Sequence, residues 1–249
     1  MGKEKRPYGS WPSPITTDLI TADVVTLGEV RVDGDDLYWI EMRPAEKGRT
    51  VIVRRSAEGE IEDVTPAPFN ARTRVHEYGG APYLVHDGTV VFSNFADQRL
   101  YRIRPGGEPE PLTPEAKLRF ADGIVDAARE RYIFVCEDHG KEGVEPQNMI
   151  VTVSFESGEI RVLAEGRDFY AAPRLSPDGS QLAVIAWDHP NMPWDETDLW
   201  LGDFSDEGHL FRGHRVAGGP GVSVAEPRWS PDGILYLSLI HISEPTRRH

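Results

Sequence analysis

The sequence predicts an all-β chain: a partial β-propeller of four four-stranded blades plus the start of a fifth, with a short N-terminal helical segment. The tetrapeptide Ser-Pro-Asp-Gly occurs at 176–179 and again at 230–233. Apolar segments of strand length recur at intervals of roughly 40 to 55 residues, which is the period of propeller blades. The 20 Pro and 24 Gly suit a chain with many turns.

Residues 1–27 precede the repeats and form the first expected unit. Thr16 or Thr17 is expected to cap a short helix in the sequence TDLITADVV, which carries Leu19, Ile20 and Val24 on one side. A segment of this kind is expected to pack on another surface, because its apolar side chains have no partners of their own.

Residues 28–236 form the expected partial propeller, and the second strand of each blade gives its register. These strands are expected at the apolar segments 37–40, 90–92, 133–135, 182–185 and 235–237. No stretch between 27 and 236 has a convincing helical period. A blade buries its faces only against neighbouring blades, so the predicted stability is a sum of neighbour contacts.

Composition excludes several classes of function. The formal net charge of −14 would repel nucleic acid phosphates and anionic membranes, so neither is an expected partner. No apolar run is long enough for a signal peptide or a membrane span. Cys136, the only cysteine, cannot form an internal disulfide and is expected to be an inert core thiol. These features predict a cytoplasmic protein.

The candidate site residues lie mainly in two long loops that follow the second strands of the third and fourth repeats. The first loop contains Asp138 and His139, and the second contains Asp188, His189 and Trp194. Long loops on a rigid scaffold are where function concentrates. Aspartate and histidine are metal-ligand types and acid–base types, but no complete ligand set or nucleophile accompanies them, so no metal or cofactor is expected.

Glu77, in the sequence His76-Glu77-Tyr78-Gly79-Gly80, is the other candidate. It is expected to enter an inner strand close to the central channel. Two interpretations stay open: a charge that is satisfied at a strand end, or a carboxylate that faces a substrate tunnel.

No catalytic residue is expected in this chain. The nearest match to a G-x-S-x-G nucleophile elbow is 221–225, where Ala225 replaces the last glycine. It also lacks the strand-turn-helix context that the elbow requires.

Several of these motifs together resemble a known family. GSWPSPIT at 9–16, RVHEYGG at 74–80, the two Ser-Pro-Asp-Gly turns and WDHPNMPWD at 187–195 resemble the N-terminal propeller of prolyl-oligopeptidase-family serine peptidases. The acylaminoacyl-peptidase or dipeptidyl-aminopeptidase type is the most similar. The resemblance extends from residue 7 to about residue 236.

The resemblance implies a propeller that caps a C-terminal α/β-hydrolase domain and restricts entry to short peptides. The family's Ser, Asp and His triad belongs to that domain, so a chain without it would be inactive alone. The candidates for substrate gating or domain contact are then Glu77, Asp138, His139, Asp188, His189 and Trp194. The alternatives are a stand-alone binding or scaffold propeller, and a small propeller enzyme of the lactonase sort with a central metal.

Residues 237–249 are expected to be a non-native tail. The sequence LSLIHISEPTR at 237–247 can be encoded by a transposase sequencing adapter and interrupts a blade in mid-strand. The predicted domains are therefore 1–27, 28–236 and this tail. Four blades and a partial fifth predict an open arc with unpaired strand edges.

Overall fold

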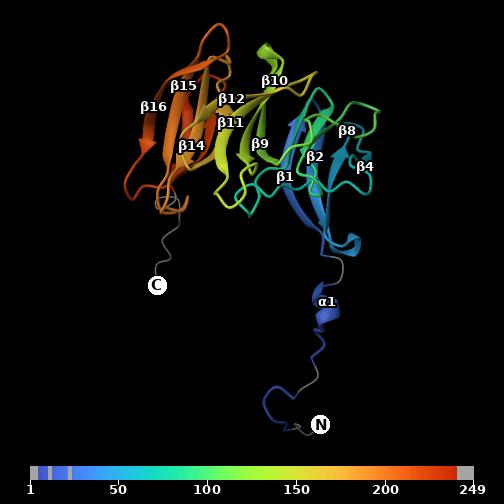
Figure 1. Ribbon diagram of the computed structural model, residues 1–249. Coiled ribbons are helices and arrows are strands. Elements are labelled where there is room, and N and C mark those ends of the chain that lie inside the picture. The colour runs from blue at the N-terminus through green and yellow to red at the C-terminus, as the bar shows by residue number, and fades with distance from the viewer. Residues whose placement is uncertain (1–4, 11–12, 22–23, 240–249) are drawn as a thin grey trace.

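The computed structural model describes residues 5–10, 13–21 and 24–239. Five antiparallel sheets follow one another in chain order, four with four strands and a last one with two. Figure 1 shows these sheets side by side, with the N-terminal segment extending away from them. The predicted partial propeller of four blades and the start of a fifth is confirmed.

Helix α1 (Thr17–Thr21) is the predicted N-terminal helix. The backbone N–H of Leu19 donates to Thr16 Oγ1 at 3.1 Å, which identifies Thr16 as the cap. Leu19 and Ile20 are 60% and 62% exposed, so they do not pack on the propeller. None of the described helices is long and apolar enough to cross a membrane.

The strands of each blade are consecutive in the chain. Blade 1 contains β1 (Thr26–Asp33), β2 (Asp36–Arg43), β3 (Arg49–Arg55) and β4 (Ile61–Asp63), with the 3-10 turn η1 (Pro44–Glu46). Blade 2 contains β5 (Tyr83–His86), β6 (Thr89–Ser93), β7 (Leu100–Ile103) and β8 (Glu110–Pro111). Blade 3 contains β9 (Leu118–Asp126), the 3-10 turn η2 (Ala127–Arg129), β10 (Arg131–Asp138), β11 (Gln147–Ser154) and β12 (Ile160–Glu165).

Blade 4 contains β13 (Phe169–Leu175), β14 (Gln181–Trp187), β15 (Asp198–Phe204) and β16 (Leu210–Gly218). Blade 5 contains β17 (Val224–Trp229) and β18 (Leu235–Leu239). The five predicted second strands are β2, β6, β10, β14 and β18, each in second place in its own sheet. Strands β10 and β14 are longer than predicted and end at Asp138 and Trp187. β11 pairs with β10 as far as Asp138, and β15 pairs with β14 as far as Ala186.

The hydrophobic core is divided into four clusters, each of which joins two adjacent blades. Between blades 2 and 3, Leu84 and Val91 pack with Phe134. Between blades 4 and 5, Ile185 packs with Val224. Two equivalent clusters lie between blades 1 and 2 and between blades 3 and 4. This arrangement is the neighbour-by-neighbour burial that stacked blades require.

The innermost strand of four blades contains the same irregularity. One extra residue interrupts the register of β1, β9, β13 and β17 against the second strand of the same blade. At each of these bulges one residue has a left-handed backbone, with φ of 51° at Glu29, 54° at Asp122, 50° at Ala172 and 50° at Glu226. A bulge re-aims side chains and bends the strand.

The entry to blade 2 differs from the prediction. The segment 74–80 is a turn, and the inner strand β5 begins only at Tyr83. His76 and Glu77 are consecutive left-handed residues, with φ of 56° and 63°. Two such residues in succession cannot continue a strand, which is why the motif forms a turn.

The predicted tail begins inside β18. Ser238 and Leu239 pair with Ala225 and Val224 of β17, so the first residues of this segment extend a strand of the last blade. Residues 240–249, the rest of the predicted tail, lie outside the described residues.

Candidate functional site

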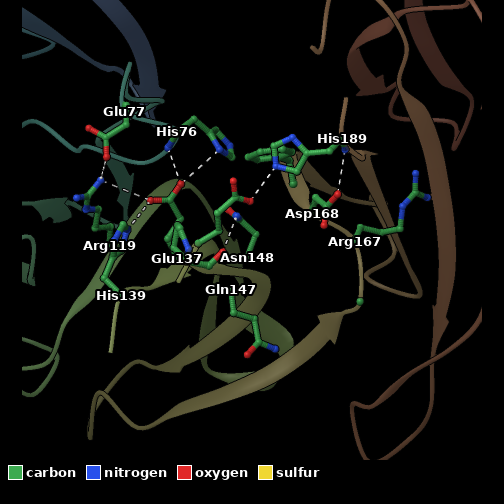
Figure 2. A pocket seen from close by; sticks show the side chains of 14 residues that line it. His76, Glu77, Arg119, Glu137, His139, Gln147, Asn148, Arg167, Asp168 and His189 are labelled. Carbon is green, nitrogen blue, oxygen red and sulfur yellow. Dashed lines mark hydrogen bonds and ion pairs between the residues drawn. The ribbon is translucent and has the colours of Figure 1, made fainter. Parts of the chain in front are cut away.

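A cavity of about 680 Å³ opens on the propeller face opposite the Ser-Pro-Asp-Gly turns. Blades 3 and 4 and the 74–80 turn contribute its walls (Figure 2). It is lined by His76, Glu77, Arg119, Glu137, His139, Glu145, Pro146, Gln147, Asn148, Gly166, Arg167, Asp168, Phe169 and His189.

Glu137 is buried in one wall of this cavity and contacts several of the other residues that line it. Its side chain is 3% exposed and lies one residue before the end of β10. Oε1 accepts the backbone N–H of His76 at 2.6 Å, and Oε2 lies 2.9 Å from His139 Nε2 and 3.7 Å from Arg119 Nη1. A buried carboxylate with several donors stays in place and fixes the groups around it.

His76 connects blades 2, 3 and 4. Its Nε2 lies 3.0 Å from the carbonyl oxygen of Tyr170, so this nitrogen carries the proton that the carbonyl accepts. Its ring packs near Trp187 and Phe169, with centroid distances of 5.3 and 5.8 Å. Burial lowers the pKa of His76 below its ordinary value, against the opposing effect of the Glu137 charge.

Glu77 lies at the rim of the cavity and is 79% exposed. Arg119 Nη1 donates to its Oε1 at 2.6 Å and also to the carbonyl oxygen of Arg74 at 2.9 Å. The hydrogen bond from Arg119 lowers the pKa of Glu77, so this carboxylate stays ionised.

The opposite side of the cavity comes from the ends of blade 4. His189 Nε2 lies 3.0 Å from Glu145 Oε2, and its backbone N–H donates to Asp168 Oδ2 at 2.9 Å. Arg167 Nε donates to Asp188 Oδ2 at 2.7 Å. Figure 2 shows Glu137 with His76 and Arg119 on one side of the cavity, and His189 with Asp168 on the other.

The structure brings together three of the six predicted residues, Glu77, His139 and His189, on this one cavity. Asp188 lines an adjoining cavity, which shares Arg167 and His189 with the first. Asp138 and Trp194 line neither cavity. Asp138 Oδ1 instead accepts the backbone N–H of Gly140 at 2.7 Å, and Trp194 is 54% exposed on the loop that follows β14.

Sequence reasoning missed His76, Arg119 and Glu137 as members of this site. One signal for Glu137 was present: Asp138 and His139 lie 50 residues before Asp188 and His189, and the same offset aligns Glu137 with Trp187. Both side chains are buried, and both lie against His76.

The predicted metal-ligand types do not converge. In the described part of the chain, the group that meets a metal's spacing is Asp33, His86 and Asp87, which includes none of the predicted residues. Ser223 of the near-match to a nucleophile elbow is buried, and its hydroxyl donates to the carbonyl of Pro193 at 2.6 Å. That hydrogen bond is typical of a structural serine.

The lining of the cavity favours a small cationic ligand. It contains four carboxylates (Glu77, Glu137, Glu145 and Asp168) against two arginines. Phe169 stacks on Trp187 at 5.2 Å and meets the ring of His189 edge-on at 5.0 Å, which adds an apolar surface beside the acidic groups. An amine with an adjacent apolar group matches this combination.

Comparison with known proteins identifies solved structures that share this fold. A puromycin hydrolase mutant complexed with PGG matches with a TM-score of 0.86 and 36% identity, over 94% of this chain and 39% of that one. A puromycin-hydrolyzing peptidase from Mycobacterium tuberculosis matches with a TM-score of 0.82 and 38% identity, over 95% of this chain and 39% of that one.

TolB from Acinetobacter baumannii matches with a TM-score of 0.56 and 16% identity, over 84% of this chain and 47% of that one, which is a likeness of fold alone. No model of a protein family and no curated protein matches the chain. The likeness to the puromycin hydrolases extends over nearly all of this chain, at 35–38% identity. The chain is therefore a partial β-propeller related to the peptidases of the prolyl-oligopeptidase family, and it spans 39% of the length of the puromycin hydrolases that it matches.

Proposed function

We propose that this chain is the substrate-gating propeller of a serine peptidase that acts on short peptides. Its partner in this proposal is an α/β-hydrolase domain that carries the catalytic residues. The observation that carries the proposal is the 36% identity to a puromycin hydrolase over 94% of this chain. That match covers 39% of the puromycin hydrolase, and we assign the catalytic domain to the remaining part.

The cavity lined by Glu77 and Glu137 supports a role in admitting and positioning the substrate. Its carboxylates suit the ammonium group of a short peptide, and the Phe169 surface suits an apolar side chain next to it. The cavity is open on one face of the propeller, where a second domain would confine the bound peptide. Confinement of this kind excludes long or folded chains by size.

We also propose that this chain alone does not hydrolyse peptides. Among the described residues, no serine hydroxyl is hydrogen-bonded to a histidine. The activated nucleophile of a serine peptidase therefore has no counterpart among these residues. We place the protein in the cytoplasm, because its single cysteine, Cys136, is a buried free thiol that requires no oxidising compartment.

A chimera tests the proposal. Residues 1–236 of this chain would be joined to the part of the Mycobacterium tuberculosis puromycin-hydrolyzing peptidase that follows its matching segment. The chimera is expected to release free amino acid from puromycin and from short peptides, while the 249-residue chain alone releases none.

The site is tested in the same chimera with Glu145→Gln and with the control Glu159→Gln, an exposed carboxylate on the distant edge of blade 3. Removing a carboxylate from the cavity is expected to raise KM for substrates with a free amino terminus, with kcat retained, because an ion pair in binding is lost. A folded chimera without activity contradicts the proposed function and makes a stand-alone scaffold propeller the better interpretation. Hydrolysis by the isolated chain also contradicts it, because the catalytic residues would then lie in this chain.

A further inference from the structure

Another cavity, of about 260 Å³, lies on the axis around which the blades are arranged. Every residue that lines it belongs to an innermost strand, except Ala81, which lies two residues before the start of β5. Blades 1, 4 and 5 each contribute one arginine: Arg31, Arg174 and Arg228. This cavity is separate from the larger one on the propeller face, with which it shares no lining residue.

The three arginines occupy the same structural position. Each stands two residues after the left-handed residue of its bulge, at the point where the register of the inner strand resumes. In blades 1 and 5 the left-handed residue is a glutamate, which pairs with the arginine of the same strand. Arg31 Nη2 lies 3.1 Å from Glu29 Oε2, and Arg228 Nη2 lies 2.9 Å from Glu226 Oε2.

Arg174 lacks this partner, because Ala172 occupies the position of the glutamate. No carboxylate of the described residues lies within ion-pair distance of Arg174. Its Nη1 donates to the neighbouring carbonyl of Pro173 at 2.7 Å, while its Nε is buried and has no acceptor among the described residues. Burial and the nearby charges of Arg228 and Arg31 lower its pKa, with Asp122 opposing the arginines.

Asp122 does not neutralise this arginine by contact. Its Oδ1 accepts the backbone N–H of Ala81 at 2.8 Å, and its Oδ2 accepts the backbone N–H of Ala172 at 3.2 Å. The carboxylate therefore ties the inner strand of blade 3 to those on either side. A guanidinium group stays charged at any ordinary pH. The buried Nε–H of Arg174 therefore still lacks a negatively charged acceptor among the described residues.

We propose that the axial cavity is a binding site for a small oxyanion, a carboxylate or a phosphate group, held by Arg174 with Arg31 and Arg228 around it. The planar guanidinium presents paired N–H donors that match the two oxygens of such a group. The volume of about 260 Å³ suits a single anionic group or the end of a chain. The inference rests on the propeller alone and holds whether or not the chain gates a peptidase.

Isothermal titration calorimetry on the 249-residue chain tests this site. The probes are sodium acetate, trialanine with a free carboxylate, trialanine amide and inorganic phosphate, each at constant ionic strength set with chloride. Saturable binding of acetate and trialanine, but not of the amide, assigns the site to carboxylates. Saturable binding of phosphate alone assigns it to phosphate. If none of the four probes binds more strongly than chloride, the proposal is overturned.

Three variants locate the binding. Arg174→Gln is expected to weaken it about tenfold or more, the size of one lost charge-assisted pair. Arg161→Gln, which removes a 73% exposed arginine on the outer strand of blade 3, is the matched control and is expected to bind like the wild type. Equal affinities in Arg174→Gln and the wild type would show that the anion binds elsewhere and would overturn the proposal.

Ala172→Glu is a second variant, which tests the site even if Arg174→Gln does not fold. It installs the carboxylate that Glu29 and Glu226 already provide at the same left-handed backbone position. The new side chain is expected to pair with Arg174, to abolish anion binding and to leave the melting temperature equal or higher. Unchanged anion binding in a folded Ala172→Glu variant would contradict the proposed site.

Discussion

Blades 3 and 5 are the same kind of β-meander, but they differ in how they are buried. In blade 3, the residues from Tyr132 to Glu137 of β10 are consecutively buried. In blade 5, no residue of β18 is buried, and Tyr236 and Leu237 are 59% and 37% exposed although both are apolar. The difference follows from neighbours: blade 3 is covered on both faces and blade 5 on one.

Blade 1, at the other end of the array, shows the same pattern as blade 5. Leu27, Val30 and Val32 of β1 are 65%, 61% and 71% exposed. The strands at the two ends of the array are therefore apolar in sequence but exposed in the structure. A strand pattern in a repeat protein specifies which face is apolar, whereas burial depends on the next repeat.

The largest expected effect is at the centre of the array. Phe134 is 1% exposed and packs edge-on against Phe120, with ring centroids 6.1 Å apart. Phe134→Ala is expected to lower the free energy of unfolding by about 3–5 kcal/mol, because it removes buried surface and leaves a cavity. The matched end variant, Tyr236→Ala, is expected to change it by about 0.5 kcal/mol or less. Urea denaturation measures both, and equal losses would remove the distinction between centre and end.

The second effect concerns overpacking in the same region. A Cβ on Gly123 would collide with the rings and methyl groups of Phe134 and Leu84, which belong to adjacent blades. Gly123→Ala is expected to destabilise the chain by about 1–3 kcal/mol. Gly213, on the outer strand β16, has nothing within 4 Å of the equivalent position. Gly213→Ala should therefore be close to neutral in the same measurement, and a larger loss there would contradict the contrast.

The third effect is a dependence on pH at the junction of blades 2, 3 and 4. Burial lowers the pKa of His76 in the folded chain, so the neutral ring is favoured by folding. The charges that face it are those of Glu137 and Asp122. The stability that His76 contributes is fully present above its unfolded pKa of 6.5 and is lost as the pH falls below that value.

Denaturation curves between pH 7.5 and 5, values that bracket the ordinary histidine pKa at about 6.5, measure this loss. A His76→Gln variant lacks the titrating ring, so its stability is expected to vary less over the same interval. Parallel pH profiles for the variant and the wild type would show that His76 makes no such contribution.

The smallest effect compares the two Ser-Pro-Asp-Gly turns. Asp178 accepts from Ser176 Oγ at 2.6 Å and from both the backbone N–H and the hydroxyl of Ser180, at 3.1 and 2.8 Å. These hydrogen bonds, with that of Ser176 the largest, lower its pKa to about 2. In the blade 5 turn, Ile234 replaces the second serine, and Asp232 accepts from Ser230.

The turn in blade 4 is expected to lose its contribution as the pH falls from 3.8, the ordinary pKa of aspartate, to about 2. Carboxyl carbon chemical shifts would follow this titration directly. Ser180→Ala is expected to raise the pKa of Asp178 toward its ordinary value, since the hydroxyl donor of Ser180 is removed while the backbone N–H at that position remains. An unchanged titration in Ser180→Ala would show that the Ser180 hydroxyl does not lower the pKa of Asp178.

The repeat and its second strands could be predicted from sequence because turn residues and apolar alternation are local signals. The Ser-Pro-Asp-Gly turn at 176–179 and the strand after it fixed the position of blade 4 directly. The candidate site was harder to predict, since its contacts join distant segments. Glu137 bonds to His76, 61 residues earlier in the chain, and His76 bonds to Tyr170, 94 residues later.

The turn at 74–80 shows why local sequence signals did not predict part of the site. A left-handed backbone at His76 and Glu77 is sustained by the hydrogen bond from His76 N–H to Glu137 and by the pairing of Glu77 with Arg119. No local propensity indicates such a conformation for two consecutive residues with side chains. The three residues that were missed act through these long-range contacts, whereas Glu77, His139 and His189 were found because they stand at loop ends.

The repeated bulge has a consequence for how such a chain diversifies. Glu29, Asp122, Ala172 and Glu226 hold one equivalent position in four blades, and the two glutamates lie outside the four inter-blade cores. A single codon change at either glutamate alters the charge along the axis by one unit without repacking a core. Selection can therefore adjust what the axis accepts one blade at a time, while the scaffold that folds the chain stays the same.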